Sequence, residues 1–159
     1  MQRVVRVNKA QLNNYANMIV SCAGYQDYDV GLIMVQDKEI QLMNQQYRGK
    51  DEVTDVLAFP YHEILPENAG LLPEVHPEER ILGDVVLGMP YIASDCFKRA
   101  EDVQTTLLSI FTHGLCHLVG FNHESQDEWM QMYKKELNIL EKFNKLTGCQ
   151  CKPLLGLGH

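Results

Sequence analysis

The alternation of apolar and polar residues along the chain predicts a small sheet. Four short runs are rich in β-branched and other apolar residues and are expected to be strands: 3–7, 28–36, 53–59 and 81–87. Pro60 follows the third run and is expected to end that strand. The segment 63–80 contains five glutamates and three prolines, so we expect it to be an exposed loop.

Apolar residues that recur every three or four positions predict four helices. These helices are expected from about Leu12 to just before Gly24, from a cap at Asp37 through Tyr47, from about Asp102 to Val119, and between Ser125 and Gly148. The third helix is apolar around most of its circumference, so it should lie at the centre of the molecule. Ser125 and Glu128 have the spacing of a capping box for the last helix. The expected fold class is therefore α+β, a mixed α/β domain in which helices pack on a four-stranded sheet.

Length and composition fit one folded domain. The chain has 159 residues, of which 45% are hydrophobic and 22% charged, and we assign residues 1–159 to a single domain. No apolar run approaches the roughly 18 residues that span a bilayer, so no membrane partner is expected. Five cysteines at irregular spacing favour a reducing compartment over a disulfide framework. Cys149 and Cys151 are expected to lie in a loosely ordered tail that begins at about residue 149.

Charge is unevenly distributed along the chain. The net charge of −7 divides into +2 for residues 1–50, −12 for 51–128 and +3 for 129–159. The acidic middle argues against a large basic nucleic-acid surface there, although it leaves room for local basic contacts from the two ends. Residues 1–26 contain basic but no acidic side chains, which is compatible with an organelle-targeting segment as well as with a folded strand and helix.

The strongest chemical signal is the segment Thr112 to Glu124, THGLCHLVGFNHE. His113 and His117 are four residues apart on a predicted helix, so their imidazoles project from the same face. Gly120 ends the helix and lets the chain turn back, which brings His123 in as a third ligand. Three protein nitrogens leave a fourth zinc position for water, as in catalytic zinc sites, and the metal lowers the pKa of that water to about 7. We therefore predict a hydrolase with one zinc ion per chain.

The histidine spacing also matches the metzincin protease pattern H-E-x-x-H-x-x-G-x-x-H, with one departure. Gly114 stands where the protease has the glutamate that serves as general base. The sequence thus favours a substrate other than a peptide. It leaves three carboxylates as candidates for the base or for a supporting contact to the site: Asp55, Asp84 and Glu124.

Two more segments, RGKDEVTDVLAFP from Arg48 to Pro60 and LGDVVLG from Leu82 to Gly88, accompany the histidine motif. Together the three resemble the YbeY family of endoribonucleases, also called rRNA maturation factors. That family shows an arginine followed by a TDVLSFP-like strand, an LGD strand, and HGxLHLxGxDH. The departures are Ala58 for serine, Cys116 for leucine and Asn122 for aspartate. The loss of the aspartate beside the third histidine is expected to weaken metal binding somewhat.

The resemblance implies a zinc-dependent, single-strand-selective endoribonuclease that acts in ribosomal RNA processing and small-subunit assembly. It also implies that Arg48 belongs to the active site, where its guanidinium would pair with the phosphoryl oxygens as negative charge develops on them. The alternative for Arg48 is a helix-end arginine that interacts favourably with the helix dipole.

Two other functions stay open at this point. One is a metalloprotease, favoured by the metal motif and disfavoured by Gly114. The other is a non-catalytic ribosome-assembly factor, whose acidic centre would suit docking onto a basic ribosomal protein of the small subunit. The motif HGLCHL and an N-terminus without acidic residues resemble eukaryotic members of the family, which implies a mitochondrial protein. A bacterial member would be cytoplasmic.

Overall fold

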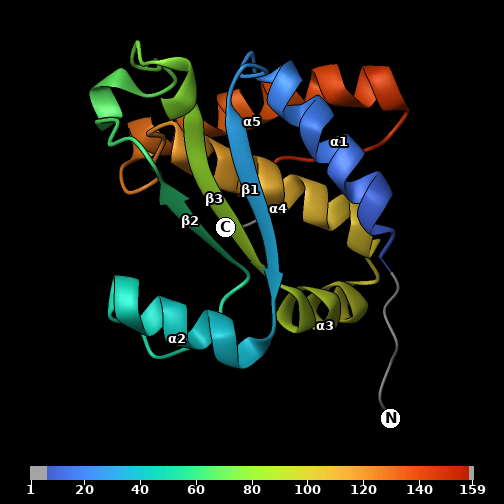
Figure 1. The fold of residues 1–159 in the computed structure, drawn as a ribbon. Coiled ribbons are helices and arrows are strands. Elements are labelled where there is room, and N and C mark those ends of the chain that lie inside the picture. Colours follow the sequence, from blue (N-terminus) through green and yellow to red (C-terminus); the bar gives the residue numbers. More distant parts are fainter. Residues whose placement is uncertain (1–6, 158–159) are drawn as a thin grey trace.

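Strand β3, Ile81–Gly88, forms the centre of the sheet in the computed structural model, which describes residues 7–157. This strand is apolar along almost its whole length and is buried except at its first residue and at Asp84. It pairs in parallel with β1, Asp29–Val35, and antiparallel with β2, Val56–Pro60. The strand order is therefore β1-β3-β2, which leaves β2 at one edge (Figure 1).

The mixed α+β class is confirmed, and the strand count is corrected. Within residues 7–157 the sheet has three strands rather than four. The strand expected over 3–7 falls outside the described residues except for Val7, which is not in a strand. The strand expected from Val53 begins at Val56 and includes Pro60, which an edge strand tolerates because one side of its backbone needs no sheet partner.

Helix α4, Val103–Leu118, is the central helix that the sequence predicts. Asp102 caps its first turn by accepting the backbone N–H of Thr105 at 2.9 Å. The helix packs on β2 and β3 on one side and on α1, Lys9–Cys22, and α5, Gln126–Thr147, on the other (Figure 1). Most of its residues are therefore buried.

Helix α2, Asp37–Arg48, covers the opposite face of the sheet from α4. Ile40 of α2 belongs to a small buried cluster with Val86, whereas the adjacent Val85 faces Gly114 of α4. Neighbouring residues of a strand point to opposite faces, so the two helices lie on different sides. The sequence predicts a cap at Asp37 for α2, but the residue that caps this helix is Gln36.

The other helix ends follow the sequence closely. Ser125 and Glu128 form the expected capping box at the start of α5, and Gly148 ends that helix in the left-handed conformation at φ 79°. Helix α1 ends just before Gly24, as expected. None of the helices in residues 7–157 is long and apolar enough to cross a membrane.

Helix α3, Met89–Arg99, was not predicted from the sequence. Its buried face consists of Ile92 and Cys96, one turn apart, while Tyr91 and Phe97 are exposed. The short apolar face gives little periodicity. The available signal was Pro90 in the first turn, a position that proline favours in helices.

The segment after α5 corrects the expectation of a loose tail from about residue 149. Cys151, Leu154 and Leu155 are buried in the main core. The side chain of Asn144 donates to the Cys151 carbonyl at 2.9 Å and accepts the Cys151 N–H at 3.0 Å. Residues 149–155 are thus held to α5 by packing and by hydrogen bonds, because three apolar side chains gain burial there.

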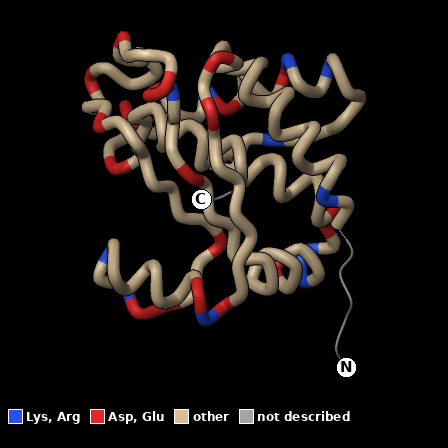
Figure 2. Tube along the Cα trace, viewed as in Figure 1, with Lys and Arg blue, Asp and Glu red and all other residues tan. Residues whose placement is uncertain are grey.

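The segment between β2 and β3 is the loop that the sequence predicts. It contains only two short 3-10 turns, Pro66–Asn68 and Pro77–Glu79. Acidic residues are frequent in this loop, which lies at one end of the sheet (Figure 2). Ile64 and Gly70 of the loop contact the turn that follows α4, since Gly120 abuts Ile64 and Gly70 lies against Phe121.

Candidate metal centre and active-site cleft

The three predicted histidines converge on one point. His113 and His117 project from the same face of α4, one turn apart. Gly120, with φ 99°, reverses the chain after the helix, and a side chain there would collide with Ile64. His123 then follows, and one ring nitrogen of each histidine lies within 4.8 Å of the others. The ligand geometry that the spacing predicts is therefore present.

Hydrogen bonds fix the proton positions on two of these rings. His117 Nδ1 lies 2.9 Å from the carbonyl oxygen of Phe121, which can only accept, so Nδ1 carries the proton. His113 Nδ1 donates to the Glu136 carboxylate at 3.1 Å in the same way. In neutral rings both Nε2 atoms then carry a lone pair.

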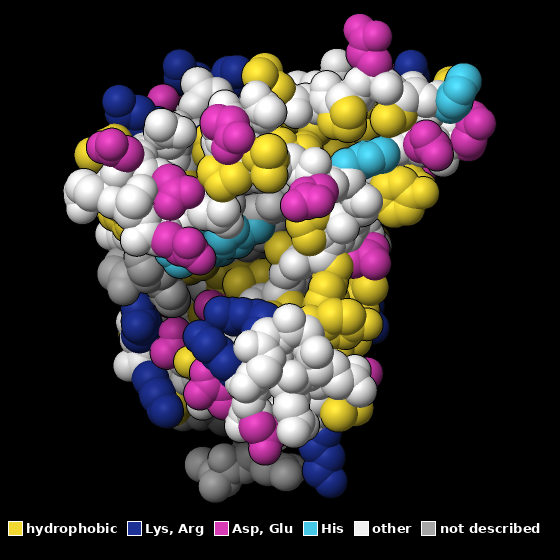
Figure 3. All heavy atoms as spheres, turned by 90° about the vertical axis from the view of Figure 1, so that its left-hand side faces the viewer, with side chains coloured by type: hydrophobic (Ala, Val, Ile, Leu, Met, Phe, Trp, Pro, Cys, Tyr) yellow, Lys and Arg dark blue, Asp and Glu magenta, His cyan; other side chains and the backbone are white. Residues whose placement is uncertain are grey.

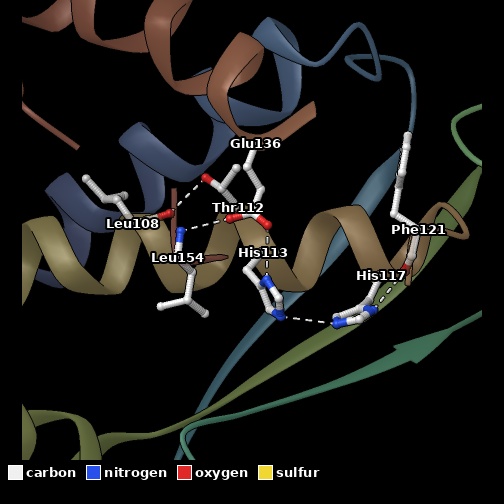
Figure 4. A network of polar contacts seen from close by, with 7 residues as sticks. All are labelled: Leu108, Thr112, His113, His117, Phe121, Glu136 and Leu154. Atoms are coloured by element: carbon white, nitrogen blue, oxygen red, sulfur yellow. Dashed lines mark hydrogen bonds and ion pairs between the residues drawn. The ribbon is translucent and has the colours of Figure 1, made fainter. Parts of the chain in front are cut away.

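Those two Nε2 atoms face each other at a distance of 3.1 Å (Figure 4). Two lone pairs at this distance repel unless a cation or a proton lies between them. Burial, reinforced by the nearby His113, His123 and Arg48, lowers the pKa of His117 to about 4, with the Phe121 hydrogen bond acting in the opposite direction. The ring is therefore neutral at neutral pH, and the donor set fits a metal ion with imidazole preference, such as zinc.

Glu136 of α5 belongs to the candidate site, and the sequence analysis did not identify it. It is fully buried, and its two oxygens are used separately: Oε2 accepts from His113 and Oε1 accepts the backbone N–H of Leu154 at 2.8 Å (Figure 4). A carboxylate behind a metal-binding histidine fixes the ring orientation and raises the basicity of the ligand. The signal in the sequence was a glutamate placed between Met132 and Leu140 on the apolar face of α5.

An open cleft of about 710 Å³ lies in front of the histidines. Figure 3 shows the histidine side chains in this hollow, with basic side chains on the rim below them. The cleft is lined by the end of α2, the edge strand β2 with the residues before it, the histidine turn and the C-terminal segment: Tyr47, Arg48, 54–60, His113, His117, 122–124 and Leu154. It therefore runs along the open edge of β2, between α4 on one face of the sheet and α2 on the other.

Arg48, which the resemblance assigns to the active site, lines the same cleft as the histidines. It is the last residue of α2 and is exposed. Its positive charge is close enough to help lower the pKa of His117. Within residues 7–157 the guanidinium forms no ion pair, so it is available to an anionic group in the cleft.

The three candidate carboxylates are not brought together. Asp55 and Glu124 both line the cleft, Asp55 half-buried beside Thr54 and Glu124 exposed beside His123. Asp84 does not line the cleft. Its side chain lies against Gly31 of β1, on the face of the sheet opposite to Val85. The histidines of α4 are on the Val85 side, so Asp84 does not contact them.

Gly114 has a packing role that the motif comparison alone did not show. A Cβ atom at this position would lie 2.7 Å from Val85 Cγ1, so α4 approaches the sheet closely at this point. A glutamate there would meet the sheet and not the cleft. The position is therefore incompatible with the general base of a metzincin.

Sequence comparison gives consistent matches along almost the whole chain. The family model described as endoribonuclease YbeY matches residues 2–144. The human protein named endoribonuclease YbeY is 41% identical over 155 residues, covering 97% of this chain and 91% of its own length. The protein of the same name from Clostridioides difficile strain 630 is 31% identical over 147 residues, covering 90% of this chain and 92% of its own length.

A solved structure supports the fold independently. The solution structure of TM1509 from Thermotoga maritima matches with a TM-score of 0.53 at 22% identity, covering 94% of this chain and 95% of its own. All three histidines, Arg48 and Glu136 lie within residues 2–144, which the family model covers. Leu154, which contacts Glu136, lies beyond them.

Proposed function

This chain belongs to the endoribonuclease YbeY family, and on that premise we propose that it is a zinc-dependent, single-strand-selective endoribonuclease that acts in ribosomal RNA processing and small-subunit assembly. The observation that carries the zinc assignment is the pair of Nε2 atoms 3.1 Å apart, both with their Nδ1 protons directed away. His113, His117 and His123 would hold one zinc ion per chain.

Zinc held by three imidazoles acts as a Lewis acid and lowers the pKa of water to about 7. The protein supplies the other components of the reaction. Arg48 binds the phosphoryl oxygens in the cleft and stabilises the charge that develops on them, with two parallel N–H donors. Glu136 holds His113 in the ligating orientation. Asp55 and Glu124 are the two carboxylates that line the cleft and could accept a proton there.

Ribosomal RNA as the substrate is the finer part of the proposal. It rests on the family resemblance and on the acidic loop 63–80, whose charge suits contact with a basic protein of the small ribosomal subunit. We also propose a mitochondrial location for a eukaryotic source and a cytoplasmic one for a bacterial source. The human relative is more similar to this chain than the Clostridioides protein is, which favours the mitochondrial alternative.

The protease alternative is not favoured, because Gly114 packs on Val85 and no carboxylate can replace it at that position. One set of assays separates the functions. Purified protein should contain about one zinc per chain, and His117→Ala should lose it. Single-stranded RNA should be cut in a chelator-sensitive manner, whereas casein should not. Proteolysis without RNA cleavage, or full zinc content in His117→Ala, would overturn the proposal.

A further inference from the structure

Two aromatic rings in the wall of the cleft have no part in the mechanism described so far. Tyr47 and Phe59 both line the cleft, and their ring centroids are 4.9 Å apart with an angle of 69° between the planes. The Tyr47 side chain is 69% exposed, although a ring of this size gains most from burial. Its position is therefore not explained by core packing.

The sequence of α2 accounts for this placement. Ile40, Met43 and Tyr47 lie on one face of the helix, and Ile40 is fully buried against the sheet. Phe59 packs against the same small core cluster from β2. The apolar face of α2 thus begins in the core and ends in the cleft, where Phe59 supports the Tyr47 ring and solvent reaches the rest of it.

The cationic side chain that lines the cleft belongs to the residue next to Tyr47. Arg48 follows Tyr47 directly and lines the cleft, and the exposed Lys50 comes two residues later. The carboxylates of Asp55 and Glu124 line the same cleft, and Asp51 directly follows Lys50 in the sequence. Arg48 is the one Lys or Arg side chain among the described residues that line the cleft. A phosphate group that enters the cleft is therefore attracted to Arg48, which places the base of that nucleotide within reach of Tyr47.

We propose that Tyr47, supported by Phe59, is a stacking platform for one unpaired RNA base, in the nucleotide whose phosphate lies at Arg48. This inference rests on the proposed endoribonuclease function and locates the source of its single-strand selectivity. An unpaired base can leave its neighbours and stack on an aromatic ring, whereas a base within a duplex is already stacked on both sides. Every base has a π-face and can stack on an aromatic ring. This platform therefore distinguishes single-stranded from double-stranded RNA more than it distinguishes one base from another.

The test uses the zinc-loaded full chain with Tyr47→Leu, Tyr47→Phe and Tyr47→Trp, and with Tyr61→Leu as the matched control. Tyr61 is also exposed but does not line the cleft. Tyr47→Leu should raise KM for a single-stranded oligonucleotide about tenfold with little change in kcat, since the platform binds the substrate and takes no part in the chemistry. Tyr47→Phe, Tyr47→Trp and Tyr61→Leu should stay close to the wild type. Any residual cleavage of duplex RNA should be unaffected by Tyr47→Leu, so the preference for single strands over duplex should fall.

An abasic-site scan identifies the base itself. Removing the base at one nucleotide of the substrate should raise KM for the wild type, and the same removal should have no further effect in Tyr47→Leu. Equal losses in both proteins at every position would overturn the inference. So would a KM for Tyr47→Trp well above that of the wild type, which decides the matter even if Tyr47→Leu folds poorly. Chelator-sensitive cleavage by the wild type tests the proposed function separately, so each can fail without the other.

Discussion

The Glu136 carboxylate accepts the backbone N–H of Leu154 at 2.8 Å and so ties the C-terminal segment to the candidate metal centre. The other oxygen of the same carboxylate accepts His113 Nδ1–H. Both donors, His113 Nδ1–H and the Leu154 N–H, belong to buried residues, and a buried donor without an acceptor lowers the stability of the fold. The segment 149–155 is therefore part of the architecture behind the histidines, although it lies beyond the residues that the family model matches.

Glu136→Gln should weaken zinc binding by about 10- to 100-fold, the usual loss when a residue behind a metal ligand is changed. Glutamine has one acceptor oxygen for two donors, so its amide N–H₂ must face either His113 or Leu154. Competition with a chromogenic chelator measures the affinity. Glu141→Gln, on the exposed side of the same helix, is the control, and equal zinc affinity in the two variants would contradict a positioning role for Glu136.

Truncation after Gly148 should lower both the melting temperature and the zinc affinity. It removes the buried Cys151, Leu154 and Leu155 and leaves Glu136 Oε1 without its donor. Burial of apolar side chains is worth about 1.5–3 kcal/mol each, so the loss of stability should be large. Lys152→Ala, at an exposed position of the same segment, is the control and should change neither property. A stable, fully zinc-loaded chain ending at Gly148 would show that the tail is dispensable.

Arg48→Ala should keep its fold and its zinc, but its rate of RNA cleavage should fall by about 10²-fold or more. Arg48→Lys should recover only part of this loss, because an ammonium group cannot form two parallel hydrogen bonds. If Arg48 only interacts with the dipole of α2, Arg48→Ala should instead lower stability by less than about 1 kcal/mol and leave cleavage unchanged. Melting temperature, zinc content and single-turnover cleavage of the same three preparations distinguish the two roles.

Gly114→Glu, which restores the protease motif in the sequence, should not produce a protease. The new side chain would meet the buried Val85 instead of the cleft, so the variant should be destabilised by about 2 kcal/mol or more. Gly114→Ala, with its single methyl group, should be affected less. Thermal unfolding and a casein assay test this, and a stable Gly114→Glu variant with peptidase activity would show that the position faces the active site.

The local parts of the site were predictable from the sequence, because helix geometry and turns depend on neighbouring residues. The spacing of His113 and His117, the turn at Gly120 and the arrival of His123 follow from helical periodicity and from glycine. The cap at Ser125 follows in the same way. Hydrophobic periodicity is weak in a helix with few buried residues, and α3 buries only Ile92 and Cys96, so the sequence did not predict it.

Tertiary structure alone decided which distant segments meet at the histidines. Asp84 looked equivalent to Asp55 in the sequence, but the alternation of β3 turns it to the other face of the sheet. Glu136 is 23 residues from His113, and Leu154 is 18 residues from Glu136, so no local rule could pair them. The sequence thus determined the three histidines of the candidate metal centre. The packing of α5 and of the C-terminal segment on α4 determined what holds those ligands in place, because contacts between distant segments depend on how whole elements pack.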